Sequence, residues 1–135
     1  PVENYSDRKD FANVGIYSQT AEQQYFPYIR PQENGTKSDI RYWNQTDNNG
    51  FGLRINSNKL FSASALHYAI NDLDNGAEKD QRHSPDIPKS KYTNLCIDGA
   101  QMGLGGTNSW GAWPLEKYRL HYQDREFNFS LSVVK

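Results

Sequence analysis

Two tryptophans, Trp110 and Trp113, stand in a glycine-rich segment, residues 97–113, where the run GGTNSW favours a loop. The electron-rich face of an indole ring packs well against the C–H face of a pyranose, and a rigid ring adds affinity without freezing many bonds. Asn108 and Ser109 are placed to meet hydroxyl groups at the edge of such a sugar. The pattern therefore predicts a sugar-binding loop with Trp110, Asn108 and Ser109 as contact residues. The alternative is that one or both tryptophans fold back and cover the end of the protein.

Hydrolysis of a glycosidic bond requires two carboxyl groups that face each other across the bond. Glu33, in the run PQENG, is a candidate for one of them. An acidic side chain just before a turn more often faces water or caps backbone amides. Because the sequence pairs no second carboxylate with Glu33, it assigns no catalytic residue.

Metal binding and covalent catalysis have weaker support. The run NDLDNGAE contains Asp72, Asp74 and Glu78 but lacks the full spacing of a calcium loop, so a solvated helix end is favoured. The three histidines lie too far apart for metal-ligand spacing. Cys96 has apolar neighbours, which would raise the pKa of its thiol, and no serine follows the nucleophile-elbow pattern. We expect no metal site and no cofactor site in this chain.

The charge balance excludes two classes of partner. The 15 basic and 16 acidic residues give a formal net charge of −1. The chain therefore lacks the basic surface that is typical of proteins that bind nucleic acids or anionic membranes. No apolar run reaches the roughly 20 residues that a membrane-spanning helix needs. We expect neither nucleic acid nor membrane among the partners.

Alternating apolar and polar residues predict β-strands in the first two thirds of the chain. A turn at Asn48-Asn49-Gly50, with positive φ at both central positions, would join the first two of these strands. Asn34-Gly35 would form another hairpin turn after a strand over residues 25–31. The predicted strands cover residues 40–46, 51–55, 60–66 and 92–97.

The C-terminal part predicts a further hairpin, with strands over residues 117–122 and 127–133 around Gln123-Asp124-Arg125. Helix is predicted only as single turns, at residues 20–24, where Thr20 and Gln23 have capping-box spacing, and at residues 70–75. Residues 78–90 predict a long exposed loop. The sum is one all-β domain over residues 1–135, an antiparallel β-sandwich with one or two single-turn helices.

Three segments resemble glycoside hydrolase family two β-galactosidases. The run CIDGAQMGLGGTNSWG, residues 96–111, is similar to a signature near the C-terminus of those large enzymes. The run PYIRPQENG, residues 27–35, resembles a second signature, and LFSASALHYAINDLD, residues 60–74, resembles the segment between them. The chain is thereby identified as similar to the C-terminal, small-chain domain of that family, over nearly its whole length.

The resemblance implies a partial supersandwich of the galactose-mutarotase type, corresponding to the second half of the family's domain and truncated on its N-terminal side. In that family the loop tryptophan reaches into the active site of a neighbouring barrel domain and stacks on the substrate, a role that falls on Trp110. The catalytic glutamates and the Mg and Na ligands of the parent enzyme lie outside this region, so none is carried over. Thr107 and Asn108 stand where members often have two aspartates, so the charge of the loop differs.

The implied activity is retaining hydrolysis of terminal β-galactosides by the complete enzyme, with this chain inactive alone. The implied partners are a galactoside, the barrel domain and, through open strand edges, further copies of the chain in a homo-oligomer. Two other functions stay open, a free-standing carbohydrate-binding module and a structural or oligomerisation domain. We expect a soluble protein of the bacterial cytoplasm or periplasm.

Overall fold

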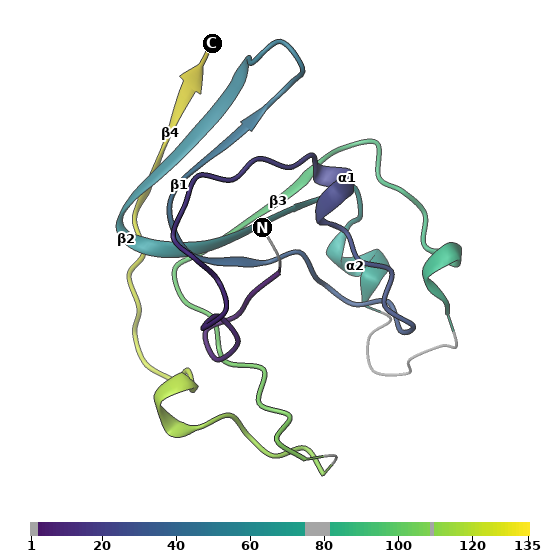
Figure 1. The fold of residues 1–135 in the computed structure, drawn as a ribbon, viewed down its shortest axis with the longest axis vertical. Helices are drawn as coiled ribbons and strands as arrows, with labels where there is room; N and C mark the ends of the chain where they lie inside the picture. Colours follow the sequence, from purple (N-terminus) through teal and green to yellow (C-terminus); the bar gives the residue numbers. More distant parts are fainter. Residues whose placement is uncertain (1–2, 75–81, 109) are drawn as a thin grey trace.

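A computed structural model of the chain describes residues 3–74, 82–108 and 110–135. In this part the four strands form one antiparallel sheet, in the order β1-β2-β3 with β4 also paired to β2 (Figure 1). The strands are β1 (Lys37–Thr46), β2 (Gly52–Leu66), β3 (Asn94–Asp98) and β4 (Phe129–Val134). The connections contain the helices α1 (Ala21–Gln24) and α2 (Ile70–Leu73) and the 3-10 turns η1 (Ser84–Asp86) and η2 (Glu116–Tyr118). The prediction of an all-β, antiparallel fold with single-turn helices is confirmed.

Strand β2 organises the sheet because it pairs with all three other strands. Its first half pairs with β4, from Gly52 to Ser57, and its second half pairs with β3, from Ser62 to Leu66. Strand β1 follows the opposite edge with two shifts of register, next to Asp39, whose φ is +57°. The two strands predicted over residues 51–55 and 60–66 are thus one continuous, strongly curved strand (Figure 1).

The turn between β1 and β2 is held by one aspartate. Asp47 Oδ1 accepts hydrogen bonds from the backbone N–H of Asn49 (2.8 Å) and of Phe51 (3.0 Å). The predicted hairpin is confirmed, but only one of its central residues, Gly50 with φ +84°, has a positive φ. The Asp47 carboxylate binds these two backbone amides, so the turn is held without a second residue of positive φ.

The core lies along β2 and consists of two clusters. In one cluster, side chains of β1 and of the segment before β4 pack on β2. In the other, side chains of α2 and of the residue after η1 pack on the end of β2. The first contains Ile55, Phe61 and Ala63, with Trp43 and Phe127 among the side chains packed on it. The second contains Leu66, Tyr68, Leu73 and Ile87, with Tyr25 packed on it.

The hairpin predicted around Asn34 and Gly35 is wrong, because residues 25–31 form no strand. Asn34 is buried, and its side chain bonds the backbone of Phe26 and Gln32 rather than forming an exposed turn. Gly35 does have a positive φ, +79°. The turn residues were identified correctly, but they close a buried loop instead of joining two strands.

The hairpin predicted over residues 117–133 is half right. Strand β4 is confirmed, whereas residues 117–122 contain part of η2 and no strand. This segment does not reach the sheet, because the Tyr118 carbonyl accepts a hydrogen bond from Gly103 N (2.8 Å), in the loop after β3. Its alternating apolar side chains do not share a buried face, and Tyr122 is exposed.

Several smaller predictions are settled. Helix α1 begins at the predicted capping box, in which Thr20 and Gln23 satisfy each other's backbone N–H. Helix α2 is confirmed over Ile70–Leu73, and the predicted stop at Gly76 lies outside the described residues. Strand β3 is confirmed. Among the described residues, no helix has the length and apolar character that crossing a membrane requires.

Candidate functional site

The segment with the two tryptophans, residues 103–115, projects from the body of the protein between β3 and η2, and we call it the tryptophan loop. It lies at the opposite end of the molecule from the C-terminus (Figure 1). Trp110 is 91% exposed and Trp113 is 68% exposed. In this chain the tryptophans therefore do not fold back into a core, and the Trp110 indole is open to a ligand.

The base of the loop is held by two consecutive residues from the N-terminal segment. The Asp7 carboxylate accepts hydrogen bonds from the backbone N–H of Leu104 (2.9 Å) and of Gly105 (2.9 Å). The Arg8 guanidinium donates to the Gly105 carbonyl and lies 3.3 Å from Asp7 Oδ2. Partial burial alone would raise the pKa of Asp7, but the amides of Gly105 and Leu104 and the neighbouring Arg8 charge hold it below its usual value.

Glycine is required where the two arms of the loop meet. Gly105 has φ +68°, and a Cβ there would lie 2.9 Å from Ala112 O and 2.9 Å from Pro114 N. Gly106 and Gly111 also have positive φ, but a Cβ on either would meet no atom within 4 Å. The arms are therefore packed at Gly105 and open toward the tip.

The tip is shaped by Asn108, one of the predicted sugar contacts. Asn108 Oδ1 accepts hydrogen bonds from the backbone N–H of Trp110 (2.9 Å) and of Ala112 (3.4 Å). The carbonyl of this side chain therefore serves the loop itself, since it caps two amides of the tip. Ser109, the other predicted polar contact, lies outside the described residues. The predicted sugar contacts of these residues stay predictions.

The second arm of the loop is tied to η2. Arg119 Nε donates to the Pro114 carbonyl (2.7 Å), and the Arg119 guanidinium carbon lies 5.9 Å from the centre of the Trp113 ring. Glu116 forms an ion pair with Arg119 (3.0 Å), and its other carboxylate oxygen lies 2.7 Å from His121 Nε2. Trp113 thus has a cationic neighbour on its own chain.

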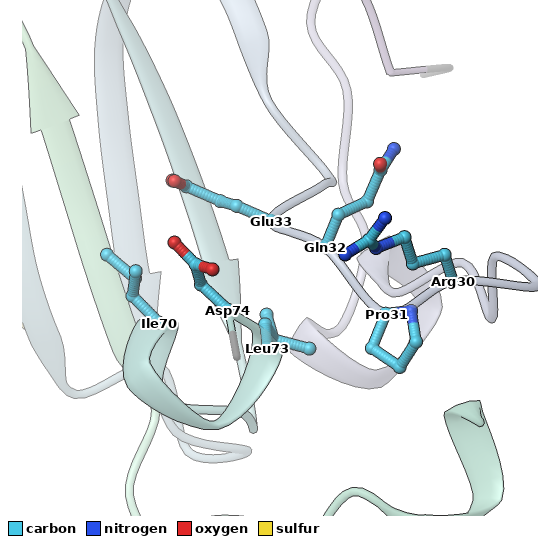
Figure 2. A pocket seen from close by; sticks show the side chains of 7 residues that line it. All are labelled: Arg30, Pro31, Gln32, Glu33, Ile70, Leu73 and Asp74. Atoms are coloured by element: carbon cyan, nitrogen blue, oxygen red, sulfur yellow. The ribbon is translucent and has the colours of Figure 1, made fainter. Parts of the chain in front are cut away.

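Glu33, the candidate catalytic carboxylate, lines an open cavity of about 350 Å³ beside α2. Figure 2 shows Glu33 reaching the cavity from the PQENG run and Asp74 from the end of α2. The apolar floor comes from Ile70 and Leu73. Glu33 is exposed, as the sequence favoured.

Cys96 on β3 is the free thiol of the chain. Burial, together with the nearby charge of Glu33, raises the pKa of the Cys96 thiol, as its apolar neighbours predict. A thiol whose pKa is raised is protonated near neutral pH and is a poor nucleophile. The structure therefore gives Cys96 no activated character.

A second carboxylate, Glu3, holds the PQENG run against the N-terminal segment. It accepts hydrogen bonds from the hydroxyls of Tyr5 (2.8 Å) and Tyr28 (2.9 Å) and from Gly35 N (2.7 Å). Burial and the bond to Glu3 raise the pKa of both tyrosine hydroxyls, and burial lowers the pKa of the neighbouring Lys37 ammonium. Glu3 therefore has a structural role, because its carboxylate is bonded to three donors of its own chain.

Sequence reasoning missed Asp7 and Arg8, and it placed Asn34 in a hairpin turn without predicting its burial. Asp7 and Arg8 contact a loop that lies more than 95 residues further along the chain, and no periodic pattern reports such a contact. The one signal in the sequence was the acidic-basic pair itself, at the end of the ENYSDR run. Among the described residues, no group of three or more His, Cys, Asp or Glu side chains is arranged to hold a metal.

Comparison with known proteins gives a consistent result. A family model described as "Beta galactosidase small chain" matches residues 1–132. The β-galactosidase BgaC of Bifidobacterium adolescentis is 36% identical over 123 residues, 89% of this chain and 11% of that protein. The β-galactosidase of Priestia megaterium is 33% identical over 133 residues, 98% of this chain and 12% of that protein. That of Halalkalibacterium halodurans is 32% identical over 136 residues, 99% of this chain and 13% of that protein. The chain spans about an eighth of the length of these relatives.

Proposed function

The chain belongs to the β-galactosidase small-chain family, and on that premise we propose that it completes the substrate pocket of a retaining β-galactosidase by presenting Trp110 to a terminal galactoside. The barrel domain of the complete enzyme supplies the two catalytic carboxylates. This chain contributes binding and no chemistry of its own.

One observation carries the proposal, the 91% exposure of Trp110 at the tip of a loop whose base is fixed. An indole that contacts so little of its own chain has its apolar face available to a sugar C–H face. A fixed base lets the indole be presented with little entropy lost on binding.

The expected size of the effect follows from the loss of a large aromatic contact. Removing a buried aromatic anchor costs roughly 1 to 3 kcal/mol, which corresponds to about a 5- to 150-fold change in an equilibrium constant. We expect Trp110→Ala to raise KM for a β-galactoside by that factor in the complete natural protein that contains this chain. Trp110→Phe keeps an aromatic ring, so its KM should lie between those of the unchanged protein and Trp110→Ala.

Trp113→Ala is the matched control, because Trp113 is on the same loop and has the Arg119 guanidinium near its ring. We expect it to change KM less than about twofold, as is usual for a substitution that removes no ligand contact. An unchanged KM in Trp110→Ala, or an equal rise in both variants, contradicts the proposed role of Trp110.

The chain alone provides a second experiment. With a chromogenic β-galactoside we expect no turnover above buffer, because retaining hydrolysis needs two carboxyl groups about 5 Å apart across the bond. Turnover by this chain that is lost in Glu33→Gln would move the chemistry to the cavity beside α2. Saturable lactose binding by tryptophan fluorescence, lost in Trp110→Ala, would instead favour a free-standing carbohydrate-binding module.

A structural role in assembly is a second candidate function, and the exposed apolar side of β4 supports it. Phe129, Leu131 and Val133 on β4 and Leu53 on β2 are all exposed. The chain has 9866 Å² of accessible surface, whereas a folded monomer of this mass has about 7200 Å². The excess is at least as large as the area that one partner buries in a permanent interface. Sedimentation of the chain and of Leu131→Lys tests this role, since self-association through β4 should be lost in the variant.

A further inference from the structure

Two side chains far from the tryptophans in sequence bond both backbone polar groups of one residue of the tryptophan loop. Gly105 donates its N–H to Asp7 Oδ2 (2.9 Å), and its carbonyl accepts from the Arg8 guanidinium. The adjacent Leu104 N–H donates to the other Asp7 oxygen (2.9 Å). Both polar groups of Gly105 are therefore bonded to consecutive residues of another segment. We call Asp7 and Arg8 the clamp.

The Asp7 part of the clamp is enclosed by the fold, while Arg8 is half-exposed. The Asp7 side chain is 5% exposed. A Cβ at Gly103 would lie 2.7 Å from Asp7 Cγ, so this glycine leaves the space that the carboxylate occupies. Hydrogen bonds that involve an ionised partner are shorter and stronger than neutral ones. The clamp therefore binds the base of the loop to the N-terminal segment more strongly than neutral hydrogen bonds at the same positions would.

The position of Trp110 depends on this base. The indole makes little contact with the chain, since it is 91% exposed. Its backbone N–H bonds Asn108, which belongs to the same tip. The tip therefore moves with the base of the loop, because its internal bonds fix its shape but do not attach it to the body of the protein.

We propose that Asp7 and Arg8 are positioning residues, which touch no substrate but hold the tryptophan loop in the orientation that binds the galactoside. The proposal rests on the proposed function, and it adds two residues to the substrate pocket that act only through Gly105. Loss of the clamp leaves the loop attached at its second arm, where Arg119 bonds the Pro114 carbonyl. The indole then samples orientations that do not bind. Substrate affinity falls in proportion to the fraction of molecules whose loop is in the binding orientation.

The test uses Asp7→Asn and Arg8→Lys, with Asp10→Asn as the matched control. Asp10 is exposed in the same segment, so its variant makes the same change of charge without touching the loop. Arg8→Lys keeps the charge but loses the fork that reaches both Asp7 and the Gly105 carbonyl. Arg8 is 47% exposed in its side chain, so this variant keeps the proposal testable if Asp7→Asn fails to fold.

The first measurement is hydrogen exchange at the amides of Leu104 and Gly105, which needs no substrate. We expect exchange at both amides to become about tenfold or more faster in Asp7→Asn and unchanged in Asp10→Asn. Equal exchange in the two variants would overturn the clamp, whatever the enzyme kinetics show.

The second measurement is a double-mutant cycle in the complete natural protein. We expect Asp7→Asn to raise KM several-fold with a smaller change in kcat, and to add nothing when Trp110 is already alanine. Effects on KM that simply add would mean that Asp7 acts on the fold in general, and would overturn the positioning role. If Trp110→Ala itself leaves KM unchanged, the proposed function fails, while the exchange data still decide whether the clamp holds the loop.

Discussion

Replacing Asn34 by alanine should remove most of the bonds that close the buried loop over residues 26–34. The Asn34 side chain is 1% exposed. Its Oδ1 accepts from Phe26 N (3.1 Å), and its Nδ2 donates to Phe26 O (3.1 Å) and to Gln32 O (3.0 Å). A neutral hydrogen bond contributes about 1 kcal/mol net, and a buried group left without a partner costs roughly 1 to 3 kcal/mol. We therefore expect the free energy of unfolding to fall by about 3 kcal/mol.

Urea denaturation of the chain, followed by tryptophan fluorescence, measures this loss. With a slope of about 2 kcal/mol per molar urea, the midpoint should fall by roughly 1.5 M at an unchanged slope. Asn48→Ala is the control, because Asn48 is exposed in the turn between β1 and β2 and its loss should cost less than about 0.5 kcal/mol. Asn34→Asp should also destabilise the chain, since it places a carboxylate oxygen against two carbonyls.

A loss below about 1 kcal/mol in Asn34→Ala, or one equal to that of Asn48→Ala, would refute the reasoning. It would mean that water replaces the amide in the loop and that the three bonds contribute nothing net. The slope provides a check on this reading. A change of slope would show that the variant alters the unfolded or native ensemble rather than the loop alone.

Three further predictions concern the loop and the thiol. Gly105→Ala should expose the tryptophan loop to limited proteolysis far more than Gly106→Ala, because both positions have positive φ but only a Cβ at 105 meets backbone atoms, at 2.9 Å; equal cleavage rates would count against the packed base. Alkylation of Cys96 by iodoacetamide should be slower at pH 8 than that of a free cysteine peptide, with a midpoint above pH 9.0, since burial and Glu33 raise the thiol pKa; a midpoint below 9.0 would contradict this. Folding lowers the pKa of Asp7 from 3.8, so the stability that Asp7 contributes is fully present above that value and is lost as pH falls through the folded pKa. Exchange of the loop amides, corrected for the intrinsic rate, should therefore rise between pH 5 and pH 2, and a constant rate would contradict this prediction.

Local signals in the sequence predicted the elements whose bonds are local. The capping box of α1 uses residues three apart, and the hairpin from β1 to β2 closes over four residues. The two failures, at residues 25–35 and 117–122, are segments that form no strand and pair with no neighbouring strand. Asn34 turns inward to bond Phe26, and Tyr118 bonds the tryptophan loop instead of a neighbouring strand. Turn residues and period-two patterns describe the backbone that a segment prefers, but not the partner it finds.

The sequence by itself determined the family, the antiparallel all-β class and the glycine-rich loop that carries Trp110, because each of these is written in contiguous residues. Only the tertiary structure decided that the indole is exposed, that Asn34 is buried and that Asp7 and Arg8 hold Gly105. These contacts join residues up to 98 positions apart. Their free energy depends on distance and burial in the folded chain, and the sequence contains neither until the sheet has formed.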